Sequence, residues 1–243
     1  MASPKELDLL THDKAAGKPG APDLTAQGSF AATRGGDVLP VEGDAGGGDD
    51  DGGAAAEPGA TASASLVHST GLKHGIAEVL VVSAPSGLLP PRVLLRRRPA
   101  DDPLAPDRWD VSATAHLLPE DAGDAEAAAR RALRAAGLPS GVRLAPLPER
   151  RERLEFAVGG FVENVVVHGF TCAVDDEGGG GGGGGADAAS SGAPAPPPPS
   201  GKGPDGAERT WIAKEDALRM LTEEPAVCSP FLLAGKKAWF AAT

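Results

Sequence analysis

The stretch Asp124–Ala136 (DAEAAARRALRAA), followed by Gly137, decides the fold class of this chain. Alanine, glutamate and arginine are strong helix formers, and Asp124 stands where an acidic residue can cap a helix N-terminus. Glu126 and Arg130 are four residues apart and can pair on the helix surface, and a glycine such as Gly137 is typical of a helix end. The sequence therefore predicts a helix over residues 124–136.

Short runs rich in β-branched residues lie on both sides of this helix, and each has the length of a strand. Valine, isoleucine and phenylalanine recur in them, and the turn signal Pro85-Ser86-Gly87 separates the first two runs, which predict a hairpin. The expected strands are Ile76–Ser83, Arg92–Arg96, Leu154–Val158, Asn164–Val174 and Thr210–Ile212, and the closing helix is Lys214–Thr222. This order predicts one α/β sandwich with a mixed sheet between helices.

Two low-complexity insertions interrupt the expected sandwich. Residues 29–65 are mostly glycine, alanine and aspartate, and residues 177–208 contain eight consecutive glycines and four consecutive prolines. Segments of this composition bury too little apolar surface to fold, so both are predicted to be disordered. The expected divisions of the chain are a partly ordered lead-in over 1–28, the first part of the domain over 66–176, and its closing strand and helix over 209–243.

The formal net charge of −11 is concentrated in the same low-complexity regions. Residues 42–57 contribute −6 and residues 171–208 contribute −5, so the remainder of the chain is neutral. Acidic tracts of this kind normally keep unfolded segments in solution. The arginine triplet at 96–98 lacks interleaved aromatic residues, so we expect no nucleic-acid partner.

The sequence also favours a cytoplasmic location. No run of about 18 apolar residues could span a membrane, and the first ten residues include acidic side chains where a secretory leader would be basic and apolar. Cys172 and Cys228 lack the close spacing of a metal-binding pair and could form one bridge at most, which favours a reducing compartment. No pattern in the sequence indicates an oligomeric state.

Several segments, in this order along the chain, resemble the Nudix superfamily. The matching segments are Leu7-Asp8-Leu9-Leu10, Leu72 with His74, Leu94–Arg98, Trp109–Ala113 leading to His116, the helix ending at Gly137-Leu138, and Trp211-Ile212. They are most similar to Nudix hydrolases grouped with isopentenyl-diphosphate isomerase. The resemblance implies a Nudix-type α/β/α sandwich that hydrolyses or isomerises a diphosphate compound, either a nucleoside diphosphate derivative or a prenyl diphosphate.

The helix at 124–136 departs from the family's sequence box. In the family, three glutamates on one helix face hold divalent cations that neutralise the diphosphate and activate water. The arginine of the box matches Arg130 here, but the glutamate positions hold Arg131, Arg134 and Ala135. Two guanidinium groups would repel a cation, so the usual metal face is not expected. The box is degenerate, and the chain is a candidate pseudoenzyme.

If the chain is active, the resemblance and its acidic residues suggest a replacement set of side chains. Asp121 and His116 are the candidate catalytic residues, because each lies near the start of the box. Mg²⁺ or Mn²⁺ would be the cofactor, and the candidate metal ligands are Glu120, Asp124, Glu126 and Glu163. The isomerase branch has a cysteine two residues before the loop histidine, where this chain has Thr114. His74 and His116 are retained, but sequence alone places no acidic co-ligand beside them.

If the chain is inactive, it needs no metal, and the arginines suggest a different role. Arg130, Arg131 and Arg134 could bind a small phosphorylated molecule, because guanidinium groups match phosphate geometry, or this face could bind a protein partner. Trp109 could stack on the ligand. The alternative interpretation is structural: arginines on a solvated helix face, His116 as a loop residue and Trp109 in the core.

Overall fold

In the computed structural model of the chain, the structure describes residues 38–42, 60–84, 90–102, 104–155, 161–174 and 201–241. The strands are β1 (Val38–Pro40), β2 (Thr61–Ser63), β3 (His74–Ser83), β4 (Arg92–Arg97), β5 (Trp109–Asp110), β6 (Ala113–His116), β7 (Ala145–Pro146), β8 (Arg150–Glu155), β9 (Val162–Val174), β10 (Gly201–Lys202) and β11 (Glu208–Ala213). The helices are α2 (Ala64–Thr70), α3 (Ala125–Ala135), α4 (Lys214–Glu223) and α5 (Pro230–Ala241), with short 3-10 turns η1 (Pro119–Asp121) and η2 (Pro225–Val227).

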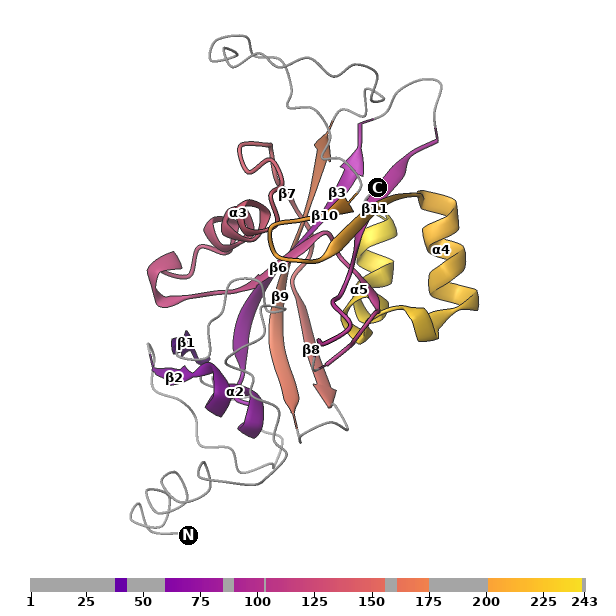
Figure 1. Cartoon of the computed structure of the whole chain (residues 1–243). Coiled ribbons are helices and arrows are strands. Elements are labelled where there is room, and N and C mark those ends of the chain that lie inside the picture. Colours follow the sequence, from indigo (N-terminus) through magenta and orange to yellow (C-terminus); the bar gives the residue numbers. More distant parts are fainter. Residues whose placement is uncertain are drawn as a thin grey trace, which may run out of the picture.

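The centre of the fold is a mixed sheet built around β3 and β9 (Figure 1). Its order is β10-β11-β4-β3-β9-β7, while β5 pairs with β4, β6 with β3, and β8 with β9. The pairing of β3 with β9 is parallel and the others are antiparallel. The expected α/β fold with a mixed sheet is confirmed.

Helices cover both faces of the sheet (Figure 1). Successive side chains of a strand point to opposite faces, so a strand with consecutive apolar residues can pack against a helix on each side. On one face, Ala77 and Val79 of β3 pack with the apolar side of α3. On the other, Leu80 packs with Leu232 and Trp239 of α5 and with residues of α4. The buried side chains of α3 are mostly alanines. Their small size lets the helix lie close to the sheet.

The sequence predicts some of the local elements of this sandwich but not α5, and β8 begins at Arg150, before the strand predicted at Leu154–Val158. The predicted helix is α3, and Asp124 caps it by accepting hydrogen bonds from the backbone N–H groups of Glu126 and Ala127 at 2.9 and 3.2 Å. Gly137 follows with a φ of +70°, the left-handed conformation that favours glycine. β3 and β4 form the expected hairpin, and β11 and α4 lie where the sequence predicts the last strand and helix, with α5 after them.

Short ordered elements lie inside both predicted insertions. β1 and β2 pair with each other within 29–65, and β10 lies within 177–208. Leu39 and Val67 are fully buried in a small apolar cluster with Leu118, which is enough to order these few residues. The predicted lead-in at 1–28 and the remaining parts of both insertions lie outside the described residues.

The arginine triplet at the end of β4 alternates between the protein interior and solvent. Arg96 and Arg98 are buried and pair with Asp110, whose Oδ2 lies 3.0 Å from Arg96 Nη2 and 2.7 Å from Arg98 Nη1. Arg97 points outward. Arg96 and Arg98 therefore point into the protein and Arg97 points into solvent, because neighbouring side chains of a strand point to opposite faces. Among the described helices, none is long and apolar enough to cross a membrane.

Candidate metal centre

Three histidines and one glutamate meet at one end of the sheet. The potential ligand atoms of His68, His74, His116 and Glu163 all lie within 4.8 Å of one another, and all four residues are buried. They belong to α2, β3, β6 and β9 respectively. This is the only such group of potential metal ligands among the described residues.

Strand register brings three of these residues together. Ile76 of β3 pairs with His116 of β6, and His74 pairs with Val165 of β9. His74, His116 and Glu163 therefore lie near the same ends of adjacent strands, on one face of the sheet. α2 packs against β9 and supplies His68, whose ring stacks on Phe161 with the ring centres 4.5 Å apart.

Glu163 is held between two imidazoles without ordinary hydrogen bonds. Its Oε1 lies 3.3 Å from His68 Nδ1, and its Oε2 lies 3.3 Å from His74 Nε2. Neither carboxylate oxygen accepts a hydrogen bond within the described part of the chain, although the side chain is only 1% exposed. A buried carboxylate without donors is costly. A cation between these four residues would satisfy it.

His74 is oriented as a metal ligand would be. Its Nδ1 lies 3.0 Å from the backbone oxygen of Leu72, an acceptor, so Nδ1 carries the ring proton in the neutral form. The Nε2 lone pair then faces Glu163. A backbone carbonyl on the distal nitrogen is the usual way in which proteins fix the tautomer of a ligating histidine.

The environment of His68 and His116 favours the neutral form of their imidazoles, which is the form that binds a metal. Burial lowers the pKa of His68 to about 4, even though Glu163 opposes this effect. Burial also lowers the pKa of His116 well below its usual value, and His74, His68 and Arg131 act in the same direction. Three imidazole nitrogens and one carboxylate suit Zn²⁺ or a transition metal such as Mn²⁺ or Fe²⁺, whereas Mg²⁺ prefers an all-oxygen set.

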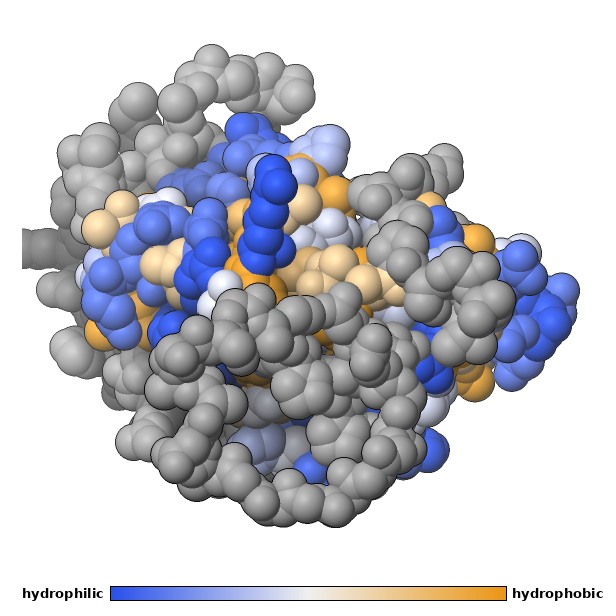
Figure 2. Space-filling view, turned by 90° about the horizontal axis from the view of Figure 1, so that it is seen from above, coloured by the Kyte–Doolittle hydropathy of each residue, from blue (hydrophilic) through white to orange (hydrophobic). Residues whose placement is uncertain are grey.

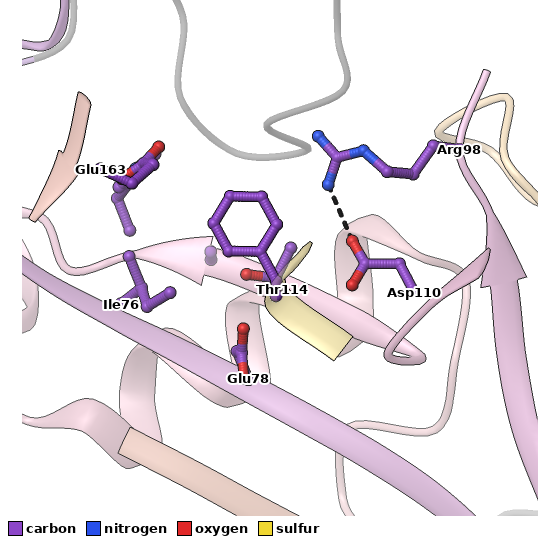
Figure 3. Close-up of a pocket in the computed structure, with 9 residues that line it drawn as sticks. Ile76, Glu78, Arg98, Asp110, Thr114 and Glu163 are labelled. Atoms are coloured by element: carbon purple, nitrogen blue, oxygen red, sulfur yellow. Dashed lines mark hydrogen bonds and ion pairs between the residues drawn. The ribbon is translucent and has the colours of Figure 1, made fainter. Parts of the chain in front are cut away.

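A small pocket adjoins the cluster and continues along the same face of the sheet (Figure 3). His116 and Glu163 line one part of it, Glu78 and Thr114 line the wall beyond them, and Phe231 of α5 also contributes. Its volume of about 20 Å³ holds roughly one water molecule. The candidate metal centre thus has space for a reacting group on one side.

The ion pair of Arg98 and Asp110 lies at the far side of this pocket (Figure 3). Burial alone would raise the pKa of Asp110, but Arg96 and Arg98 outweigh it and lower this pKa to about 2. Arg98 also contacts Asp102, with Nη2 2.8 Å from Oδ2. Its charge is therefore compensated inside the protein.

The structure places the sequence-predicted acidic residues in two groups. His116 and Glu163 are in the cluster, whereas the other acidic candidates belong to η1, α3 and the turn between them. Glu120 is exposed, Asp124 caps α3, and Glu126 accepts hydrogen bonds from Arg130 at 3.0 and 2.6 Å. These three residues lie outside the four-residue cluster.

The candidate phosphate-binding arginines and Trp109 also have structural contacts. Arg131 Nη2 donates to Asp121 Oδ2 at 2.6 Å and to the backbone oxygen of His116 at 2.7 Å. Arg134 is exposed, and its guanidinium contacts no partner within the described residues. Trp109 is half-buried against the α4 and α5 side of the core. Whether any of them binds a ligand stays a prediction.

Two residues of this region are missing from the sequence-based candidates, His68 and Glu78. His68 precedes His74 by six residues, and this pair of histidines was the available signal. Glu78 is the one charged residue within the apolar run Ile76–Ser83, where a carboxylate has no reason to stand unless it has a partner or a function. Neither signal identifies the other members of the site.

Comparison with known proteins gives structural matches only. No family model matches the chain, and no curated protein matches it. Among solved structures, a Deinococcus radiodurans protein is 11% identical with a TM-score of 0.48, covering 84% of this chain and 99% of its own. A mutT/nudix family protein from Listeria innocua is 16% identical with a TM-score of 0.41, covering 70% and 92%. The Nudix domain of Shewanella oneidensis NrtR, solved with ADP-ribose, is 14% identical with a TM-score of 0.42, covering 70% and 89%.

Proposed function

We propose that this protein is a Nudix-type, metal-dependent hydrolase whose metal centre is the cluster of His68, His74, His116 and Glu163. The observation that carries the proposal is this cluster of three imidazoles and a carboxylate without hydrogen-bond donors among the described residues, buried beside a pocket. The centre uses none of the box positions on α3. The loss of the box glutamates at 131, 134 and 135 therefore does not exclude metal-dependent chemistry.

The charge of such a centre suits a phosphorylated substrate. Three neutral histidines and one glutamate with a divalent ion would carry a net charge of +1, which attracts phosphate oxygens. A metal with four protein ligands that can accept a further one would polarise a phosphoryl oxygen or lower the pKa of a bound water. The substrate class, a nucleoside diphosphate derivative or a prenyl diphosphate, follows from the resemblance in sequence order.

Metal binding is the first test of the proposal. The purified full-length protein should bind one Zn²⁺ or Mn²⁺ per chain, measured by elemental analysis and competition with a chelator. His116→Ala or Glu163→Gln should weaken metal affinity by more than about 100-fold, since losing a residue that only hydrogen-bonds to a metal ligand already costs about 10–100-fold. His168→Ala is the matched control, because His168 is a partly exposed histidine of β9 outside the cluster. A wild type that binds no divalent ion would contradict the proposal.

Turnover is the second test. The metal-loaded protein should hydrolyse at least one member of a panel of nucleoside diphosphate derivatives and prenyl diphosphates, assayed separately with Zn²⁺, Mn²⁺ and Mg²⁺. Chelator and Glu163→Gln should both stop the reaction, because the metal supplies the activated water. A protein that binds metal but turns over none of the panel would support the metal-binding centre and contradict the hydrolase activity.

The metal-free alternative, phosphate binding by the α3 arginines, has less support. Arg131 is already engaged by Asp121 and by the backbone of His116. Arg134 remains available, but it lies on the exposed side of α3. Phosphate binding that survives chelator and is lost in the double variant Arg131→Glu with Arg134→Glu would favour this alternative over the metal centre.

A further inference from the structure

Glu78 is a second buried carboxyl group in the pocket that the metal cluster does not use. It lies on β3 four residues after His74, and alternation along the strand places both on the same face. Its partner across the antiparallel pair with β6 is Thr114, and His116 lies two residues further along that strand. Diagonal neighbours of this kind are about 7–8 Å apart, so Glu78 lies within one ligand's length of the metal centre.

One oxygen of the Glu78 carboxyl group is held by a protein partner, and the other is available to a ligand. Oε2 accepts a hydrogen bond from Arg150 Nη2 at 2.9 Å. Oε1 makes no hydrogen bond with the described residues, although the side chain is only 1% exposed. Figure 3 shows Glu78 and Thr114 on one wall of the pocket, with Glu163 further along. The geometry is that of a group positioned to act on the pocket's contents.

The surroundings of Glu78 keep its proton in place at neutral pH. Burial raises its pKa to about 8, which outweighs the opposing effect of Arg150. Arg150 is shared, because its Nε also contacts Glu152 Oε1 at 2.9 Å and its guanidinium packs on the Trp239 ring at 5.0 Å. The ionisable groups that face Glu78 or line its pocket are Arg150 and Glu152 of β8, Asp110 of β5, His116 of β6, Glu163 of β9, and Arg98 beside β4.

We infer that Glu78 is the general acid of the proposed hydrolysis, an inference that rests on the metal centre described above. A metal held by His68, His74, His116 and Glu163 would activate a water for attack. The oxygen of the attacking water forms the new bond to phosphorus, and the bond from phosphorus to the leaving oxygen breaks. Glu78 gives its proton to that leaving oxygen, and the proton released by the water returns Glu78 to the acid. A neutral carboxylic acid beside the metal supplies this step without placing another negative charge against a diphosphate.

The size of the pocket sets a condition on ligand entry. A volume for about one water cannot hold a diphosphate, so lining residues, such as Phe231 at the start of α5, have to move before a substrate enters. Such movement of a covering element is a common step in enzymes that exclude water from the reaction. Glu78 and the cluster, which lie on strands of the central sheet, keep their positions meanwhile.

The test compares metal-loaded wild type with Glu78→Gln over about pH 6–9.5, using the panel substrate that the wild type turns over. Glu78→Gln should lose at least about 100-fold in kcat, the usual contribution of general acid catalysis, while its metal content stays unchanged. The decline of wild-type rate near pH 8 should be absent from the residual activity of the variant. Glu152→Gln is the matched control, because Glu152 pairs with the same arginine but does not line the pocket.

Three outcomes would overturn the inference. Glu78→Gln could retain the wild-type rate and pH profile, it could lose its metal, or Glu152→Gln could show the same loss. If the wild type turns over no substrate, the affinity of the metal-loaded protein for inorganic pyrophosphate is measured against pH and tests the inference instead. If Glu78 is a neutral donor, the pyrophosphate affinity of the wild type should fall as pH rises through 8, relative to that of Glu78→Gln. The same pH dependence in both proteins would exclude this role. Failure of the metal centre itself would appear separately, as absent metal in the wild type.

Discussion

Arg131 connects three parts of the chain through one guanidinium group. It projects from α3, donates to Asp121 in η1 at 2.6 Å, and donates to the backbone oxygen of His116 at the end of β6 at 2.7 Å. The sequence resemblance would place a metal-binding glutamate at this position, where this chain has an arginine of opposite charge. The arginine holds the strand end that carries His116, so a residue outside the cluster contributes to its geometry.

Replacing Arg131 should therefore destabilise the fold and the metal centre together. Arg131→Glu should lower the free energy of unfolding by about 2 kcal/mol or more, because it removes charged hydrogen bonds and places a carboxylate against Asp121. Arg134→Glu, on the same helix but exposed and without a partner among the described residues, should change it by less than about 0.5 kcal/mol. Denaturant unfolding of both variants measures the difference. Equal effects would show that Arg131 is no more than a surface residue.

At the scale of elements, α5 lies against the side chain of Arg150 from β8. A side-chain carbon added at Gly235 would lie 2.3 Å from Trp239 Nε1 and 2.8 Å from Arg150 Nη2. Trp239 is fully buried, and Arg150 Nη2 is bonded to Glu78, so neither atom can move away easily. The glycine therefore permits the close approach that places Arg150 beside Glu78.

Gly235→Ala tests whether packing or helix propensity dominates at this contact. Propensity alone predicts a gain of up to about 1 kcal/mol for alanine in a helix, whereas overpacking a tight contact costs about 1–3 kcal/mol. We expect a net loss of thermal stability, measured by calorimetry. Ala234→Gly, at an exposed position of the same helix, controls for propensity and should cost about 1 kcal/mol. A more stable Gly235→Ala protein would contradict the packing account.

At the scale of the whole molecule, Asp110 joins the sheet to α5. Its Oδ2 pairs with Arg96 and Arg98, and its Oδ1 accepts a hydrogen bond from Ser229 Oγ at 2.9 Å, just before α5 begins. Arg98 extends the network to Asp102. This buried network fixes the end of β4, strand β5 and the helix that covers the pocket, so the wall of the site depends on one carboxylate.

This network predicts how stability depends on acid. The pKa of Asp110 is about 2 in the folded protein and ordinarily about 3.8, so its stabilisation is complete above the higher value and is lost as pH falls through the lower one. The difference corresponds to about 2 kcal/mol. Asp110→Asn should lower stability at pH 7 and flatten its decline between about pH 4 and 2. Asp107→Asn, in the exposed pair with Arg97, is the control and should change neither the stability at pH 7 nor its decline in acid. The same decline in Asp110→Asn as in the wild type would refute the role given to Asp110.

Sequence by itself determined some of the local elements, because the causes of these elements are local. Helix propensity and the Asp124 cap predict α3, and β-branched runs around a turn predict the hairpin of β3 and β4. It also named His74, His116 and Glu163 as residues of interest. The sequence does not predict β1, β2 and α2 as elements, because a few apolar side chains such as Leu39 and Val67 stabilise structure only once they pack together.

Only the tertiary structure decided which of these residues form a site. His68, His116 and Glu163 are far apart in sequence and meet because β3 pairs with both β6 and β9 while α2 packs against β9. Burial also sets the chemistry of the cluster and its pocket, because it lowers the pKa of His68 and raises the pKa of Glu78. Pairing partners and burial are properties of long-range contacts, which no local pattern of residue types specifies.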